Sequence, residues 1–222
     1  MISLELIFPE IFLSLSIMFL LILGVFKKNS SKLIQNISLI ILLVTAVIVF
    51  NETLGIKQTL LFNKSVIIDY LSSFMKIVTL LAAFLVLVIS SNYLKIFKIF
   101  KIEYPILILS SVLGMMVMIS SNDLIIFYIG LELQSLALYV LASFNRDNIL
   151  SSESGIKYFV LSALSSGLLL YGCSLIYGFS GSTNFQIISE QIISNSYGLT
   201  FGIVFILVGL AFKISAVPFH MW

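Results

Sequence analysis

The hydropathy pattern of the chain consists of seven long apolar runs separated by short polar or charged segments. The runs cover residues 3–26, 33–50, 71–92, 105–120, 124–143, 156–178 and 199–217. A helix needs about 20 predominantly apolar residues to cross the hydrocarbon core of a bilayer. The pattern therefore predicts an all-α fold, a polytopic transmembrane helix bundle of about seven spans.

The basic residues of the connections are distributed unequally. The first, third and fifth connections hold seven of them: Lys27, Lys28, Lys32, Lys95, Lys98, Lys101 and Arg146. The second connection holds only Lys57 and Lys64. Because loops rich in Lys and Arg stay on the cytoplasmic or matrix side, we expect the odd-numbered connections there and the N-terminus on the opposite side.

Two connections, 51–68 and 179–198, are longer than the others. In the second of them, apolar residues recur at helical spacing: Phe185, Ile188, Ile192 and Ile193. A short helix lying in the membrane interface would have this pattern, and a plain surface loop explains it equally well.

Composition agrees with a membrane protein and excludes several other classes. The chain is 60% hydrophobic and 10% charged, whereas soluble domains carry roughly 25% charged residues. A net charge of +2 gives no reason to expect a nucleic-acid partner. The single cysteine, Cys173, excludes an internal disulfide and a multi-thiolate metal site. Glycines never recur at the spacing of a nucleotide-binding loop, so we expect no cofactor in this chain.

Ionisable side chains inside apolar runs are the candidate functional residues, because each costs about 2.5–3.5 kcal/mol at mid-span. The chain has four inside or near the runs: Lys76, Glu132, Lys157 and Lys213. Glu132 lies near the middle of its run, and polar residues follow it on one helical face: Ser135, Tyr139 and Ser143. This polar face is predicted to contact protein rather than lipid. A glutamate that only holds helices together would show the same pattern.

Lys213 lies about 20 Å into the last run at 1.5 Å per residue. Pro218 follows five residues later and is expected to break or kink the helix, because proline lacks a backbone donor. Broken helices at membrane depth usually line cavities or ion sites, so Lys213 is a candidate proton carrier. The only histidine of the chain is His220. The unperturbed pKa of a histidine suits proton transfer, although an interfacial position explains this residue equally well.

The other two lysines have simpler explanations. Lys157 opens the sixth run, where a side chain reaching the membrane surface is as plausible as a proton relay. Lys76 is expected to reach the surface or to pair with a neighbouring acid, with Asp69 as a candidate. Small residues in the sixth run, the pairs Ser162/Ser166 and Ala163/Gly167, predict close helix packing on that side.

Three long stretches resemble a known family. LELQSLALYVLASFNRDN (131–148), SGIKYFVLSALSSGLLLYGCSLIYGFSGSTNF (154–185) and VGLAFKISAVPFHMW (208–222) are similar to subunit 2 of NADH:ubiquinone oxidoreductase, respiratory complex I, and to its bacterial equivalent, the chain N antiporter-like subunit. The match is dense over about the last 120 residues. In the first 100, only FPEIFL (8–13) agrees beyond the general pattern.

The resemblance implies a role in proton translocation. In that family a glutamate of the fifth helix and a lysine of the broken seventh form an ion pair that gates proton transfer, and these positions match Glu132 and Lys213. The family's sixth-helix lysine and the histidine after the break match Lys157 and His220. NADH, FMN, iron–sulfur clusters and quinone are expected in partner subunits of this reductase.

The resemblance also implies that part of the fold is missing here. The family has about 14 helices in two inverted repeats, whereas this chain stops at Trp222, so a fragment or a split-gene product is expected. On this basis 1–104 is a three-helix N-terminal segment and 105–222 the incomplete start of the first antiporter-like repeat. A second chain with the remaining helices, other membrane-arm subunits and lipids are the expected partners.

Lysine-rich, arginine-poor composition favours a mitochondrial gene, and hence the mitochondrial inner membrane with the N-terminus on the intermembrane-space side. The alternative location is a bacterial plasma membrane. Alternatives for function are a secondary cation/proton antiporter subunit of the same superfamily and a purely structural helix bundle. An unrelated small-molecule transporter is a third.

Overall fold

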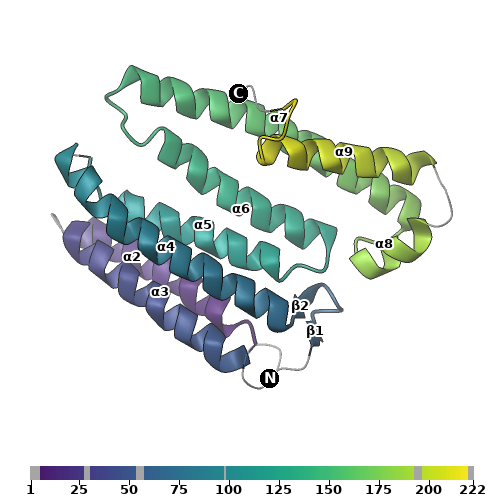
Figure 1. Cartoon of the computed structure of the whole chain (residues 1–222), viewed down its shortest axis with the longest axis horizontal. Coiled ribbons are helices and arrows are strands. Elements are labelled where there is room, and N and C mark those ends of the chain that lie inside the picture. The colour runs from purple at the N-terminus through teal and green to yellow at the C-terminus, as the bar shows by residue number, and fades with distance from the viewer. Residues whose placement is uncertain (1–5, 28–30, 54–57, 98, 193–196, 220–222) are drawn as a thin grey trace.

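The computed structural model describes residues 6–27, 31–53, 58–97, 99–192 and 197–219. The chain in these ranges is built almost entirely of helices (Figure 1). The helices and strands, in order, are α2 (Phe8–Phe26), α3 (Ser31–Thr53), β1 (Thr59–Leu61), β2 (Val66–Ile68), α4 (Tyr70–Ile96), α5 (Glu103–Ile119), α6 (Leu124–Ala142), α7 (Ile149–Ser180), α8 (Phe185–Ile192) and α9 (Tyr197–Lys213). Each of the seven predicted apolar runs coincides with one long helix.

Five of these helices, α2, α3, α4, α6 and α7, are long and apolar enough to cross a membrane. The other two, α5 and α9, are apolar but have 17 residues each. At 1.5 Å per residue they reach about 25 Å, less than the roughly 30 Å of a hydrocarbon core. A polytopic helical membrane protein is therefore confirmed, with five clear candidate spans among the described residues.

Helix α9 ends earlier than its sequence predicts. The last run was expected to continue to residue 217 and to break at Pro218, but the helix ends at Lys213. Ser215 adopts a left-handed backbone conformation with φ 53°, and the amide of Ala216 donates to the carbonyl of Ala211 at 2.9 Å. This hydrogen bond is the signature of a Schellman C-cap. The cap stops the helix before the residue preceding proline, where helical geometry is disfavoured.

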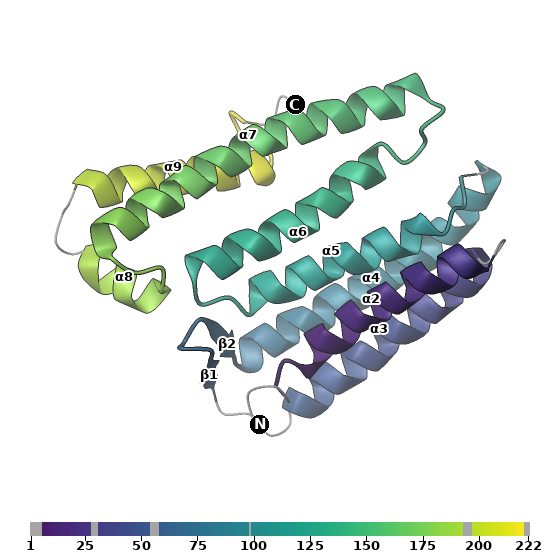
Figure 2. The ribbon, with the colours of Figure 1, turned by 180° about the vertical axis from the view of Figure 1, so that it is seen from behind.

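The helices pack into two hydrophobic clusters. One buries residues of α2, α3, α4 and α5, among them Leu20, Leu42, Leu87 and Leu109. The other buries residues of α6, α7, α8 and α9, among them Leu131, Leu169 and Ile176. Helix α6 lies between α5 and α7, as the views from both sides show (Figures 1 and 2). The carboxylate of Glu132 therefore lies on the helix that joins the two clusters.

A β-hairpin of β1 and β2 occupies the connection after α3, where the sequence predicted no regular structure. Its turn places Lys64 in a left-handed conformation, and the carbonyl of this residue accepts hydrogen bonds from the side chains of Asn122 (2.8 Å) and Asn184 (2.9 Å). The amide of Ile67 also donates to the carbonyl of Ser120 at 2.8 Å. The hairpin thus ties together three connections at one end of the bundle.

The predicted short helix in the connection before α9 is present as α8. Ile188 of this helix is buried in the second hydrophobic cluster. The last apolar residue of the predicted pattern, Ile193, lies outside the described residues.

Candidate functional site

The backbone of α6, which carries Glu132, is held in place by its N-cap and by a close contact with α5. Its N-cap Asp123 accepts a hydrogen bond from the amide of Ile125 at 2.8 Å, and the same carboxylate accepts the hydroxyl of Thr183 at 2.5 Å. Gly130, two residues before Glu132, lies against the backbone of α5 so closely that a Cβ there would be 2.7 Å from the amide nitrogen of Met118. The absence of a side chain on this glycine lets α5 and α6 touch backbone to backbone.

An ion pair joins α6 to α9. Lys213 Nζ lies 2.6 Å from Glu132 Oε1, and the hydroxyl of Ser166 on α7 donates to the same oxygen at 2.5 Å. Lys213 also donates to the hydroxyl of Ser135 at 3.2 Å. The lysine side chain is 10% exposed and the glutamate side chain 22% exposed. Three helices therefore converge on one carboxylate oxygen.

Close packing of α7 and α9 brings the lysine to this position. A Cβ on Gly209, one helical turn before Lys213, would lie 2.7 Å from Leu169 Cβ, and one on Gly172 would lie 2.8 Å from the carbonyl of Gly202. The predicted packing side of α7 was partly wrong, because a Cβ on Gly167 would meet nothing within 4 Å. Ser162 and Ser166 of the other predicted pair are buried, and the contact with α9 lies at Ser165, Leu169 and Gly172.

The electrostatics favour the closed pair. Lys213 is the last residue of α9, where the partial negative charge of the helix C-terminus stabilises a cation. At an effective dielectric constant of 20, the 2.6 Å pair gains about 6 kcal/mol before desolvation is subtracted. Removal of either partner would leave a poorly hydrated charge, so the two groups are coupled.

The other predicted site residues lie elsewhere. Lys157 is exposed near the start of α7 and pairs with Glu153 at 2.6 Å one turn away, so the structure does not bring it to Glu132. Pro218 lies in the turn after α9 and is exposed. His220 lies outside the described residues. Among the described residues, no group of three or more His, Cys, Asp or Glu is placed to hold a metal ion.

Ser166 is a site residue that the sequence pointed to only as a small packing residue. Its hydroxyl is the second donor to the Glu132 carboxylate. The hydroxyl of Tyr139, on the predicted polar face of α6, is buried without a hydrogen-bond partner in the described part of the chain. The signal that could have identified Ser166 is its polar side chain on a helix that packs against the one with the mid-span Glu132. That signal can be used only once α6 and α7 are known to be neighbours.

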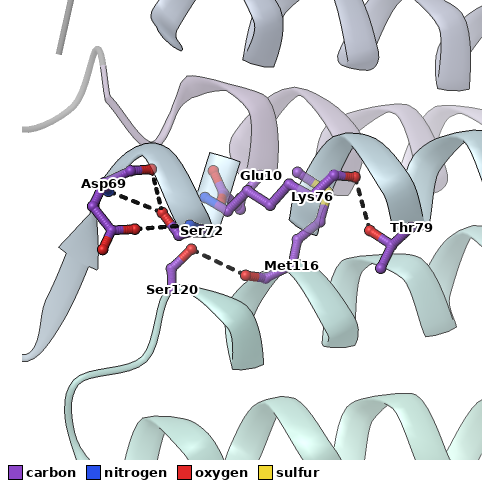
Figure 3. Close-up of polar contacts among 7 residues, drawn as sticks. All are labelled: Glu10, Asp69, Ser72, Lys76, Thr79, Met116 and Ser120. Atoms are coloured by element: carbon purple, nitrogen blue, oxygen red, sulfur yellow. Dashed lines mark hydrogen bonds and ion pairs between the residues drawn. The ribbon is translucent and has the colours of Figure 1, made fainter. Parts of the chain in front are cut away.

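A second buried ion pair lies in the N-terminal helices (Figure 3). Lys76 Nζ is 2.5 Å from Glu10 Oε1. The expected pairing of Lys76 with Asp69 is wrong, because Asp69 caps α4 and accepts the amide of Ser72 at 2.7 Å. Glu10 lies inside the first apolar run of the sequence, 66 residues before Lys76, and nothing in the hydropathy pattern marks it as the partner of that lysine.

The chain is similar to known membrane proteins, and the similarity includes the region that holds the Glu132–Lys213 pair. Residues 121–222 match the family described as "NADH:quinone oxidoreductase/Mrp antiporter, TM". NADH-quinone oxidoreductase subunit N of Pelagibacter ubique (strain HTCC1062) is 71% identical over 220 residues, which are 99% of this chain and 46% of that protein. The chain thus spans about half the length of the curated relatives it matches. The resemblance to this subunit of complex I is confirmed over almost the whole chain.

Solved structures share the fold. A chain of respiratory complex I from Thermus thermophilus with bound aureothin superposes with a TM-score of 0.78 at 24% identity, over 96% of this chain and 45% of that one. A chain of the membrane-bound sulfane sulfur reductase, an archaeal respiratory membrane complex, gives a TM-score of 0.84 at 22% identity, over 100% of this chain and 46% of that one. At this identity the likeness establishes the architecture.

Proposed function

We propose that the chain is part of a membrane-arm subunit of a proton-pumping NADH:quinone oxidoreductase, in which it contributes half of a proton-translocation channel coupled to quinone reduction. The buried ion pair between Glu132 and Lys213 carries this proposal, because it lies in the region that matches the antiporter family. The close similarity to subunit N proteins supports the assignment to such a reductase.

In this mechanism the Glu132–Lys213 pair acts as a gate. While the pair is closed, the carboxylate keeps the ammonium protonated. Once the pair opens, each charge loses its partner in a low-dielectric environment, and this favours transfer of the lysine proton to a neighbouring acceptor. The end of α9 at Lys213, with the left-handed Ser215 and with Pro218 beyond it, supplies a break at which the lysine can move. Lys157 and His220 are proposed to serve other steps of the same route.

The proposal includes a topology. Helices α5 and α9 also cross the membrane, which gives seven spans, with 1–104 as the N-terminal segment and 105–222 as the start of an antiporter-like repeat. The distribution of lysines places the odd-numbered connections on the inner side. A membrane-impermeant label directed to residues 145–153 should therefore react from the inner side only.

Partners and cofactors follow from the assignment. The remaining helices of the antiporter unit, on this or a second chain, cover α9, while partner subunits carry NADH, FMN, iron–sulfur clusters and quinone. The chain is then a subunit of an enzyme whose redox centres lie elsewhere. Bacterial relatives favour the plasma membrane over the mitochondrial inner membrane.

Substitution Glu132→Gln in the assembled complex tests the function. The change keeps the shape of the side chain and removes its charge, so coupled NADH:quinone turnover and proton pumping should fall at least tenfold. Oxidation of NADH by an artificial acceptor should remain unchanged, because that reaction needs no proton channel. Glu190→Gln, at an exposed position of α8, is the matched control. Full pumping by the Glu132→Gln enzyme would contradict the proposal.

A secondary cation/proton antiporter is the second candidate, favoured by the description of the matching family. It would use the same ion pair without a redox partner. Isolation of the native protein from membranes distinguishes the two functions. Co-purification with NADH-oxidising subunits supports the reductase, whereas cation/proton exchange by the protein without them supports the antiporter.

A further inference from the structure

A cavity of about 640 Å³ lies at the end of the bundle opposite the β-hairpin. Four helices line it: the last part of α2, the start of α5, the end of α6 and the start of α7. Figures 1 and 2 show these parts of α5, α6 and α7 at the same end of the molecule. Its volume is within the roughly 300–1,000 Å³ of pockets that hold a small molecule. The cavity is separate from the ion pair of Glu132 and Lys213, because neither residue lines it.

Aromatic contacts hold the walls of the cavity in place. The ring of Tyr139 on α6 packs edge-to-face against Phe159 on α7, with 5.7 Å between the ring centroids. In the same way, Tyr104 on α5 packs against Phe144, which follows α6, at 5.6 Å. These contacts join α5, α6 and α7 around the cavity, so its shape does not depend on a ligand.

The interior of the cavity is apolar. Its lining there includes Leu21, Leu107, Val140, Ile156 and Phe159. Phe159 is the eleventh residue of α7, about 15 Å along that helix from its start. Helices α2, α6 and α7 are candidate membrane spans, so an apolar molecule that enters this space comes from the bilayer. Apolar cavities do not hold ordered water, and a lipid acyl chain suits this one.

The mouth of the cavity is polar. It is formed by Glu103, the first residue of α5, by Ser143, the C-cap of α6, by Arg146 and by Ser152, in the first turn of α7. Glu103 and Arg146 are both exposed, and neither makes an ion pair with another described residue. One positive and one negative side chain therefore stand unpaired at the entrance to an apolar space.

A phospholipid with an ethanolamine headgroup complements this arrangement of charges. Its phosphate suits the guanidinium of Arg146, which can donate two parallel hydrogen bonds to phosphate oxygens. Its ammonium group can donate to the carboxylate of Glu103. A choline headgroup has no N–H to donate, and a glycerol headgroup brings no positive charge. Of these three headgroups, ethanolamine alone offers a charged donor to Glu103 and an anion to Arg146.

We propose that the cavity is a binding site for phosphatidylethanolamine, with the phosphate at Arg146, the ammonium group at Glu103 and one acyl chain in the apolar interior. The lipid fills the space between α2 and α5 on one side and α6 and α7 on the other. It therefore joins the two hydrophobic clusters at the end of the bundle that the hairpin does not reach. The site does not depend on the proposed function, since it uses neither Glu132 nor Lys213.

Photoaffinity labelling of the assembled complex tests the site. The probe is phosphatidylethanolamine with a diazirine in one acyl chain, present as a minor component of phosphatidylcholine nanodiscs that hold the complex. Mass spectrometry of the digested protein should find the label at Val140, Ile156 and Phe159. These residues should be labelled several-fold more than Leu164 and Leu170, which are exposed on α7 outside the cavity. Diazirine probes with choline or glycerol headgroups should label the cavity about fivefold less, the factor that one charged contact at a membrane surface contributes.

Two charge-removing variants test the headgroup contacts. Arg146→Gln removes the partner of the phosphate and should lower labelling of the cavity about fivefold. Its matched control is Lys101→Gln, at an exposed base of the same end of the bundle that does not line the cavity. Glu103→Gln should remove the preference for ethanolamine over choline. Asp147→Asn, at an exposed acid that does not line the cavity, is the control for this variant.

Ile156→Trp fills the cavity without changing a charge and should abolish the labelling of Val140 and Phe159. Leu164→Trp makes the same change on α7 outside the cavity and should leave that labelling intact. Labelling that Ile156→Trp does not reduce would overturn the proposal. The comparison of the three probes on the unaltered complex decides the question even if a variant fails to assemble. Equal labelling by the ethanolamine and choline probes contradicts the site, and so does an unlabelled cavity, which is the result expected if another polypeptide covers it.

Discussion

The contact between α5 and α6 gives a sharp test of the packing. Gly114 on α5 and Gly130 on α6 face one another across the interface. A Cβ on Gly114 would lie 2.5 Å from the amide nitrogen of Gln134 and 2.8 Å from the carbonyl oxygen of Gly130. Both neighbours are backbone atoms, which cannot move aside as a flexible side chain can. The substitution Gly114→Ala should therefore push the two helices apart.

The size of the effect follows from the distances. Non-bonded heavy atoms prefer about 3.5–4.0 Å, so the helices must separate by about 1 Å, and contacts on either side lose a quarter to a half of their attraction. Overpacking of this kind costs about 1–3 kcal/mol. Gly167→Ala is the matched control, since a Cβ there meets nothing within 4 Å. Alanine at that position should be neutral or stabilise the helix by up to about 1 kcal/mol.

Thermal unfolding of the full chain in detergent or nanodiscs can be followed with a thiol-reactive dye. Cys173 is the single cysteine of the sequence and is 6% exposed, so it reacts when the fold opens. A loss of about 2 kcal/mol in a chain of this size lowers Tm by about 4–8 °C. We expect that decrease for Gly114→Ala and an unchanged or slightly raised Tm for Gly167→Ala. Equal Tm values for the two variants would refute the close approach of α5 and α6.

Two further predictions concern Ser166, beside the Glu132 carboxylate, and Lys157, which is exposed near the start of α7. The substitution Ser166→Ala removes a hydrogen-bond donor from the Glu132 carboxylate. Because hydrogen bonds to charged groups contribute about 1.5–3 kcal/mol, the rate of proton pumping should fall about tenfold. The control is Ser174→Ala, which should pump normally because the exposed hydroxyl of Ser174 bonds only its own helix. Lys157→Gln breaks only an exposed pair on one helix, so Tm should not change. A loss of pumping in that variant at unchanged Tm would assign Lys157 to the proton route, whereas normal pumping would leave it a surface residue.

The helices could be predicted from the sequence because a lipid environment imposes a simple rule. Every backbone group must be satisfied within its own segment, so a long apolar run becomes a helix. The prediction is less accurate at the ends of the helices, because polar capping residues determine where each helix begins and ends. Helix α7 begins at Ile149, seven residues before its apolar run, because Asn148 accepts the amide of Leu150 and starts the helix in a polar segment. The hairpin was missed since it depends on distant residues such as Asn122 and Asn184.

The candidate site, like the fold, could be predicted only in part from the sequence. Glu132 and Lys213 stand out individually because each is costly in lipid, and their pairing was implied only by the resemblance to a known family. The pair of Glu10 and Lys76 was missed, although both residues lie in apolar runs. Hydropathy says which segments are buried but not which of them are neighbours. That information comes from the packing of α2 and α3 with α4 and α5.

The two buried ion pairs resemble one another in chemistry but differ in their backbone surroundings. Each joins helices far apart in sequence, by 66 residues for Glu10 and Lys76 and by 81 for Glu132 and Lys213. Lys76 stands inside a continuous helix of 27 residues, so moving it requires moving α4. Lys213 is the last residue of α9, followed by a left-handed Ser215, and a small change of backbone angles there can withdraw it from the carboxylate. Backbone mobility is therefore expected to separate the roles of the two pairs, with opening at Lys213 and a lasting contact at Lys76.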